Sequence, residues 1–146
     1  MKRILLLLFI LLSGMNVQGQ AAAMPTDKEP VFTVNFSFKG GNWTTVTGGN
    51  GKAEKRIALK SGDTFQLWFP ADAVQAPAKA RIHWVDYYIS DKLVGTSKEA
   101  PFTLRHAPKD QTAGAKTLTC KIYWTEAPDL STVRLFILEI PLMLTR

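Results

Sequence analysis

The chain has 146 residues, a length typical of one compact domain. Hydrophobic residues make up 46% of it and charged residues 21%, a composition that excludes disorder over most of the chain. The formal net charge of +6 comes from lysines and arginines scattered between the predicted strands, and this spread argues against nucleic-acid binding.

Residues 1–19 have the pattern of an export signal. Lys2 and Arg3 form a basic start, and the apolar run Ile4–Leu12 follows. A membrane-spanning helix needs about 20 apolar residues, and this run is shorter. We therefore expect a cleaved signal and no stable membrane insertion. Cleavage is expected after Gly19, or alternatively after Ala23, because both sites end in small residues. The predicted location is secreted, periplasmic or extracellular.

A polar leader, residues 20–30, precedes the first predicted strand, Val31–Phe38. Trp43–Thr47 and Arg56–Leu59 are short segments expected to pair at sheet edges, and the glycine-rich segment 48–51 predicts a tight turn between them. Thr64–Phe69 is the next strand. The connection 70–79 is ambiguous and leaves one helical turn open as an alternative.

The second half of the chain continues with Arg81–Ser90, a turn at residues 90–92, and the strand Leu93–Thr96. About seven strands at short spacing, without a helical period, predict an all-β fold: an immunoglobulin-like sandwich of antiparallel strands over residues 31–146. A small barrel is the alternative. The remaining predicted strands are Pro101–His106, Lys116–Glu126 and Thr132–Leu144.

Residues 87–97 and the following Ala100–Leu104 resemble bacterial immunoglobulin-like domains found in secreted glycoside hydrolases and cell-surface proteins. Gly114 and Thr117–Cys120 echo the Gly-led Thr-Leu-Thr strand of that pattern. The chain departs from the pattern at residues 90–92, where the family commonly has Asp-Gly, and this departure suggests a different turn. The resemblance implies the fold more firmly than the function, because such domains serve as spacers, binding modules and adhesin parts.

Side-chain alternation along the strands predicts which residues face the core. It turns Trp84 and Tyr88 outward on one strand and Lys121 and Tyr123 outward on its neighbour. These four form a candidate binding surface, because aromatic rings stack on sugars and anchor protein interfaces. A register shifted by one residue would instead bury Trp84. The predicted inward set is Phe65, Leu67, Phe69, Val85, Tyr87, Ile89, Leu118, Cys120 and Ile122.

Trp43, beside the glycine-rich segment, is a second candidate for exposed aromatic binding, with packing at a strand edge as the alternative.

The last predicted strand is apolar on both faces from Val133 to Leu144, whereas a half-solvated strand alternates. We therefore expect other atoms to pack against its second face. A loop of the same chain, a second copy of the protein, or a partner that adds a strand would each supply these atoms.

The sequence offers no catalytic, metal or cofactor site. His83 and His106 have no Ser or Cys motif beside them, and His83 and Asp86 are expected on opposite faces of their strand. No His, Cys, Asp or Glu cluster has metal-ligand spacing. The predicted function is a secreted binding module, not an enzyme, with a glycan or protein ligand. The alternative is a structural or assembly subunit of a surface complex, with homo-oligomers formed through the C-terminal strand.

Overall fold

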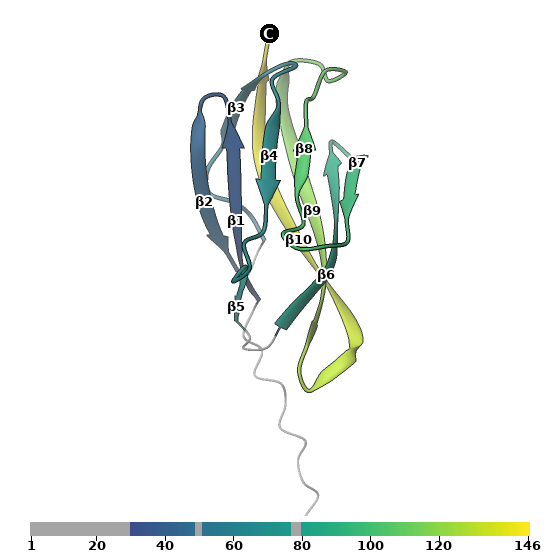
Figure 1. The fold of residues 1–146 in the computed structure, drawn as a ribbon. Coiled ribbons are helices and arrows are strands. Elements are labelled where there is room, and N and C mark those ends of the chain that lie inside the picture. The colour runs from purple at the N-terminus through teal and green to yellow at the C-terminus, as the bar shows by residue number, and fades with distance from the viewer. Residues whose placement is uncertain (1–29, 49–50, 77–79) are drawn as a thin grey trace, which may run out of the picture.

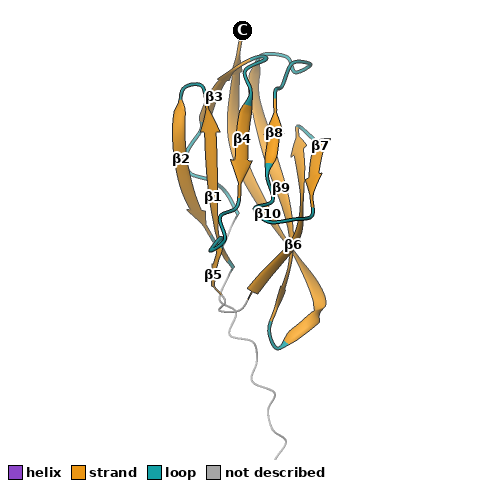
Figure 2. Cartoon of the chain, in the orientation of Figure 1, coloured by secondary structure: helices purple, strands orange, loops and turns teal. Residues whose placement is uncertain are grey.

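The computed structural model describes residues 30–48, 51–76 and 80–146. The predicted signal peptide, both cleavage sites and the leader up to residue 29 lie outside the described residues. Figure 2 shows that the described part consists of strands, loops and turns, without a helix. The strands are β1 (Val31–Phe38), β2 (Gly41–Thr47), β3 (Ile57–Lys60), β4 (Phe65–Trp68), β5 (Val74–Ala76), β6 (Ala80–Ile89), β7 (Lys92–Ser97), β8 (Leu104–His106), β9 (Gly114–Glu126) and β10 (Asp129–Thr145).

The strands form two sheets that face each other as layers (Figure 1). One sheet has the order β2-β1-β4-β8, with β5 paired to β1, and the other has the order β3-β10-β9-β6-β7. Strands β9, β10 and β6 lie together in one sheet and β4 and β8 in the other, which is the immunoglobulin-type arrangement. The prediction of an all-β, immunoglobulin-like sandwich is confirmed. The domain limits of 31–146 stay a prediction.

The strands differ from the sequence-based expectation in number and in one direction. There are ten in the described part, because the two short edge segments form β2 and β3 and because β5 lies in the ambiguous connection. β3 runs parallel to β10, over Leu142–Thr145, so the sandwich is not wholly antiparallel. β8 begins only at Leu104, since Phe102 has a φ of 51°, which is incompatible with a strand.

The turn between β6 and β7 has two residues, Ser90 and Asp91, with φ angles of 46° and 67°. Two positive φ angles in a two-residue hairpin define a type I′ turn, the type that Asp-Gly also forms. The suggestion of a different turn at residues 90–92 is therefore wrong. Asp tolerates the left-handed conformation better than most residues, and this tolerance explains how a turn without glycine keeps the hairpin.

Alternation along the strands places the core between the two sheets. All nine residues predicted to face inward are buried, including Cys120 at the centre of β9. Burial raises the pKa of the Cys120 thiol well above its ordinary value. Full burial of each large apolar side chain contributes about 1.5–3 kcal/mol, so the core can hold the two sheets together without a disulfide. The largest fully buried side chains include Phe32, Phe36, Phe65, Tyr87, Ile57 and Leu138.

Segments of the same chain cover the edge of β10 near its C-terminal end. β3 pairs with its last residues, and the backbone of Gly51 and Ala53 pairs with Glu139 through hydrogen bonds of 2.7 and 2.9 Å. The outward side chains of residues 133–137, which come before this covered edge, are open to solvent. Val133, Leu135 and Ile137 are 46%, 50% and 43% exposed. The face that was expected to need a cover is thus open over Val133–Ile137 in the described part of the chain.

Strands β9 and β10 are joined by a turn in which Asp129 organises the backbone. Its carboxylate accepts hydrogen bonds from the Ser131 hydroxyl at 2.7 Å and from the backbone N–H groups of Ser131 and Thr132 at 3.1 and 3.2 Å. These hydrogen bonds lower the pKa of Asp129 from 3.8 to about 2, and those with the side chains of Ser131 and Thr132 have the largest effect.

A lowered carboxyl pKa means that the turn is stabilised above pH 3.8 and loses this contribution as the pH falls toward 2. The amide proton shifts of Ser131 and Thr132, followed by NMR, are expected to titrate with a midpoint near 2. In an Asp129→Asn variant this titration should vanish. A midpoint near 4 in the unmodified protein would show that the capping bonds do not form in solution.

Candidate functional site

The candidate surface is the outer face of the sheet β10-β9-β6-β7. Val85, Tyr87 and Ile89 of β6 are fully buried, so the side chains between them point outward. Trp84 is partly exposed, and the alternative register that would bury it is wrong. The buried tryptophan of this sheet is Trp124 of β9, which is only 4% exposed.

Trp84 and Tyr123 are direct cross-strand partners whose rings stack, with centroids 4.3 Å apart and planes inclined by 14°. Neighbouring strands lie about 4.8 Å apart, so the two rings stand upright side by side and each covers one face of the other. Each ring has one face that its partner does not cover. β7 lies beside the strand of Trp84, and β10 lies beside the strand of Tyr123.

Lys121 and Tyr88 form a second contact on the same face. The Lys121 ammonium lies 4.5 Å from the centroid of the Tyr88 ring, a cation–π geometry. Asp86, the cross-strand partner of Lys121, accepts a 2.7 Å hydrogen bond from the Thr96 hydroxyl of β7. The four outward residues predicted on β6 and β9 thus come together as two contacting pairs, flanked by one acceptor.

Strand β10 extends this surface with aliphatic side chains. Leu135 is the cross-strand partner of Tyr123, and Ile137 is the partner of Lys121. Trp84, Tyr123 and Leu135 therefore form an apolar row across three strands. We call the set of Trp84, Tyr88, Lys121, Tyr123, Leu135 and Ile137 the outer-face patch. The sequence signal for its β10 part was the apolar character of both faces of the last strand.

Trp43 does not join the outer-face patch. It lies on β2 in the opposite sheet and stacks on Phe36, with centroids 5.4 Å apart and planes inclined by 4°. Its ring packs against the core and is partly buried. This position matches the alternative of strand-edge packing, and we leave Trp43 out of the proposed surface.

A groove of about 500 Å³ runs beside the free face of Trp84. It is lined by His83, Trp84, Asp86, Thr96 and Lys98. His83 and Asp86 therefore share one hollow, and the expectation that they lie on opposite faces is wrong. The pairing of β6 with β9 shifts by one residue between Ile82 and Trp84, and such a bulge resets the alternation at His83.

The two histidines lie in different sheets. His83 Nε2 lies 2.9 Å from the buried Thr125 hydroxyl, whereas His106 is in the other sheet, edge-on to Phe65. Burial, together with the nearby Lys92, lowers the pKa of His106.

Over residues 30–48, 51–76 and 80–146 there is no group of three or more His, Cys, Asp or Glu that could hold a metal ion. Nor does this part of the chain contain a helix long and apolar enough to cross a membrane.

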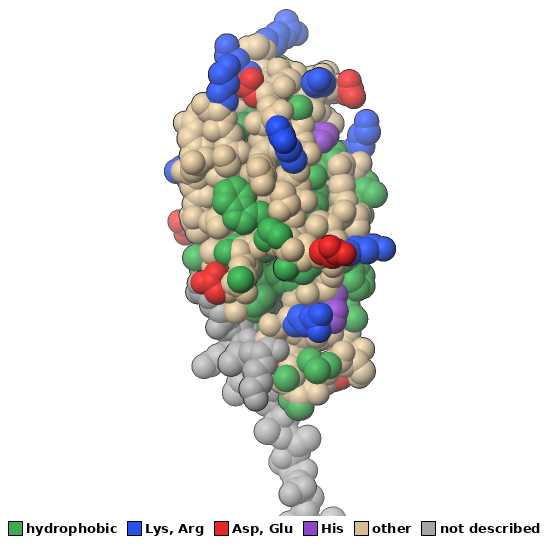
Figure 3. All heavy atoms as spheres, viewed as in Figure 1, with side chains coloured by type: hydrophobic (Ala, Val, Ile, Leu, Met, Phe, Trp, Pro, Cys, Tyr) green, Lys and Arg blue, Asp and Glu red, His purple; other side chains and the backbone are tan. Residues whose placement is uncertain are grey.

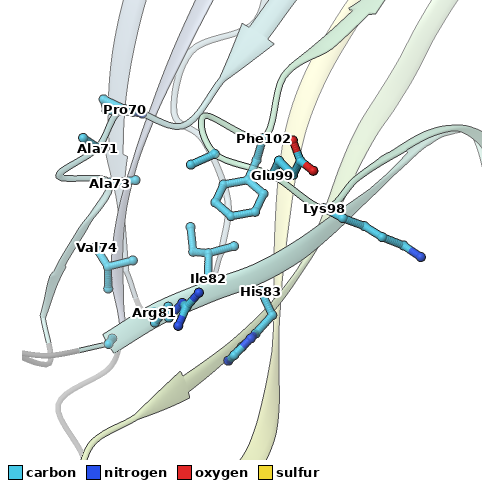
Figure 4. A pocket seen from close by; sticks show the side chains of 12 residues that line it. Pro70, Ala71, Ala73, Val74, Arg81, Ile82, His83, Lys98, Glu99 and Phe102 are labelled. Atoms are coloured by element: carbon cyan, nitrogen blue, oxygen red, sulfur yellow. The ribbon is translucent and has the colours of Figure 1, made fainter.

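A second hollow, of about 480 Å³, opens where the two sheets part near the start of β6. Figure 4 shows Ile82 and Phe102 pointing toward one another inside it, with Ala73 and Val74 on the opposite wall. In the space-filling view of Figure 3, hydrophobic side chains lie exposed in the lower central part of the face, beside a basic side chain and a histidine. Elsewhere on that face the basic side chains are spread among acidic ones.

Comparison with known proteins found no matching family model and no matching curated protein. Among solved structures, the chain is similar to fibronectin(III)-like modules of Clostridium thermocellum CbhA, with 13% identity, a TM-score of 0.42, and coverage of 65% of this chain and 98% of the module. It is also similar to a Jonesia denitrificans lytic polysaccharide monooxygenase, with 15% identity, a TM-score of 0.37, and coverage of 67% of this chain and 63% of that one. Likenesses this low carry no inference about function, and the strand order itself establishes the fold.

Proposed function

We propose that the chain is a secreted, non-catalytic binding module that holds a protein ligand on the outer-face patch. The observation that carries the proposal is the apolar row of Trp84, Tyr123 and Leu135 across three adjacent strands. An aromatic and aliphatic centre with a charged rim is the composition of protein interfaces. Secretion is supported by the export pattern of residues 1–19.

The patch is held in place before any ligand arrives. Its rings sit on strands, and the stack of Trp84 on Tyr123 and the contact of Lys121 with Tyr88 restrict the side-chain rotamers. Binding then costs little ordering of these side chains, which favours affinity for a surface of modest size.

A glycan is the second candidate ligand, supported by the groove beside Trp84. The free ring face there can stack on a sugar, and Asp86, Thr96 and Lys98 line the same groove and can hydrogen-bond to its hydroxyls. The two ligand classes make different use of the face. A protein would span the row to Leu135, whereas a sugar in the groove would leave Leu135 free.

The variants Trp84→Ala and Leu135→Ser test these proposals, with Val46→Ser as the matched control. Val46 is an exposed apolar residue of β2 in the other sheet, 55% exposed against 50% for Leu135. The purified proteins would be applied to a glycan array and to immobilised candidate proteins encoded by neighbouring genes. A protein ligand predicts that both patch variants weaken binding about tenfold or more and that Val46→Ser has no effect.

A glycan ligand predicts loss of array binding with Trp84→Ala and with Asp86→Asn, but not with Leu135→Ser. Unchanged binding in both patch variants, or an equal loss in Val46→Ser, would remove the outer-face patch as the binding surface. The alternative role as an assembly subunit predicts that the unmodified protein forms oligomers in light scattering. In that role Leu135→Ser would reduce the measured mass.

A further inference from the structure

The hollow of Figure 4 lies at a place where β6 has an unpaired edge. β9 pairs with β6 from Ala80 to Ile89, except at the bulge at His83. β7 pairs only with Val85–Ile89, so within the described ranges no strand pairs with the other edge of β6 from Ala80 to Trp84. Three of these residues, Arg81, Ile82 and His83, line the hollow. A recess with a mixed polar and apolar lining therefore lies beside backbone that is open to further pairing.

The wall opposite β6 is held firmly by backbone hydrogen bonds. The Phe69 N–H donates to the Pro101 carbonyl, and the Phe102 N–H donates to the Glu99 carbonyl, each at 2.8 Å. The buried Tyr87 hydroxyl donates to the Phe102 carbonyl. Phe102 itself has a φ of 51°, a conformation that costs free energy in a residue with a side chain. The loop thus holds the Phe102 ring in the hollow at the expense of local strain (Figure 4).

The rim of the hollow is more basic than acidic. Arg81 and Lys98 are exposed cationic residues on it, against the single carboxylate of Glu99. The apolar part of the lining comes from Ile82, Phe102, Ala73 and Val74, and polar atoms make up the rest. A ligand that matches both features carries a large apolar group next to negative charge.

We propose that an extended, acidic peptide segment of a partner protein pairs as an added strand with β6 at Ala80–Trp84 and inserts one large apolar side chain between Ile82 and Phe102. Strand addition supplies affinity through main-chain hydrogen bonds and specificity through a pocket for an alternate side chain. Asp or Glu beside the inserted residue pairs with Arg81 and Lys98. The backbone of Trp84 belongs to this site and its ring to the outer-face patch, and Lys98 lines both this hollow and the groove beside Trp84. The proposal does not depend on the function proposed for that patch.

The test uses a displayed library of random peptides about nine residues long, selected on the full chain. Selected peptides are expected to carry a large apolar residue flanked by Asp or Glu. A double variant, Arg81→Glu with Lys98→Glu, is expected to weaken the binding of a selected synthetic peptide about tenfold or more, measured by fluorescence polarisation. The control double variant, Lys60→Glu with Lys109→Glu, makes the same change of charge at exposed positions away from this hollow and should bind normally.

Two further measurements separate strand addition from binding by charge alone. N-methylation of the peptide backbone should abolish binding at alternate positions and leave it intact at those between, because every second N–H of an added strand faces its neighbour. Ala71→Trp, at an exposed position on the hollow, should block the inserted side chain. Leu135→Ser, on β10 and outside this hollow, should leave peptide binding unchanged.

Three outcomes would overturn the proposal. The first is a selection that enriches no peptide. The second is an enriched peptide that binds the Arg81→Glu, Lys98→Glu double variant as well as it binds the unmodified chain. The third is a peptide whose binding is insensitive to N-methylation at every position.

Discussion

Replacing Gly51 with alanine is expected to lower the free energy of unfolding by roughly 3 kcal/mol or more. Gly51 has a φ of +66°, and a Cβ atom added there would lie 2.0 Å from the Ile137 carbonyl oxygen. The backbone can move away only by giving up the hydrogen bond from the Glu139 N–H to the Gly51 carbonyl. The measurement is urea denaturation followed by circular dichroism.

Gly62→Ala is the matched control for the backbone effect. Gly62 also has a positive φ, +90°, but a Cβ there would meet no atom within 4 Å. Its loss of stability therefore reports the conformational cost of alanine alone, about 1–2 kcal/mol. Equal losses in the two variants would mean that residues 51–53 do not approach β10 as closely in solution.

Phe36→Ala is expected to cost roughly 3–5 kcal/mol of stability, the range for loss of a buried aromatic side chain. The Phe36 ring lies between Trp43, 5.4 Å away, and Phe65, 4.9 Å away, with nearly parallel planes on both sides. Removal leaves a cavity and frees one face of each neighbour. Denaturant titration gives the stability, and the near-ultraviolet circular dichroism of the aromatic residues should fall at the same time.

Phe38→Ala provides the comparison, because Phe38 contacts Phe36 edge-on but is only partly buried. The loss of stability in Phe38→Ala should be clearly smaller than the loss in Phe36→Ala. If the two variants lose the same stability, Phe36 does not occupy the centre of the stack.

Much of the core could be predicted from the sequence because alternation in a strand is a local property. Val85, Tyr87 and Ile89 face inward whatever strands lie beside them, provided that the strand is regular. The same rule placed Trp84 and Tyr123 outward, and the structure shows that they are direct neighbours.

The position of His83 could not be predicted, because a bulge depends on how two strands pair. Ile82 and Val85 both face the core although they are three residues apart, and only the pairing with β9 reveals the extra residue between them. The groove that His83 shares with Asp86 was missed for this reason. The spacing of two apolar residues by three within a strand was the available signal.

The edge pairing of β10 also lay beyond sequence reasoning. The apolar residues of Val133–Leu144 indicated that both faces meet other atoms, but not which part of the strand is covered. The structure covers the edge at Glu139 and over Leu142–Thr145, through residues that precede their pairing partners in β10 by more than eighty positions. Contacts between parts of the chain so far apart leave no periodic trace in the sequence.

The burial of Cys120 makes the chain convenient for site-specific labelling. Thiolates attack the double bond of maleimide reagents, and a thiol enclosed at the centre of β9 with a raised pKa does not react with them while the fold is intact. A Leu135→Cys variant would place a second, exposed thiol on the outer-face patch without any need to remove the native one. A fluorophore attached there would respond to a ligand arriving on that patch, and reaction at Cys120 would report the opening of the sandwich.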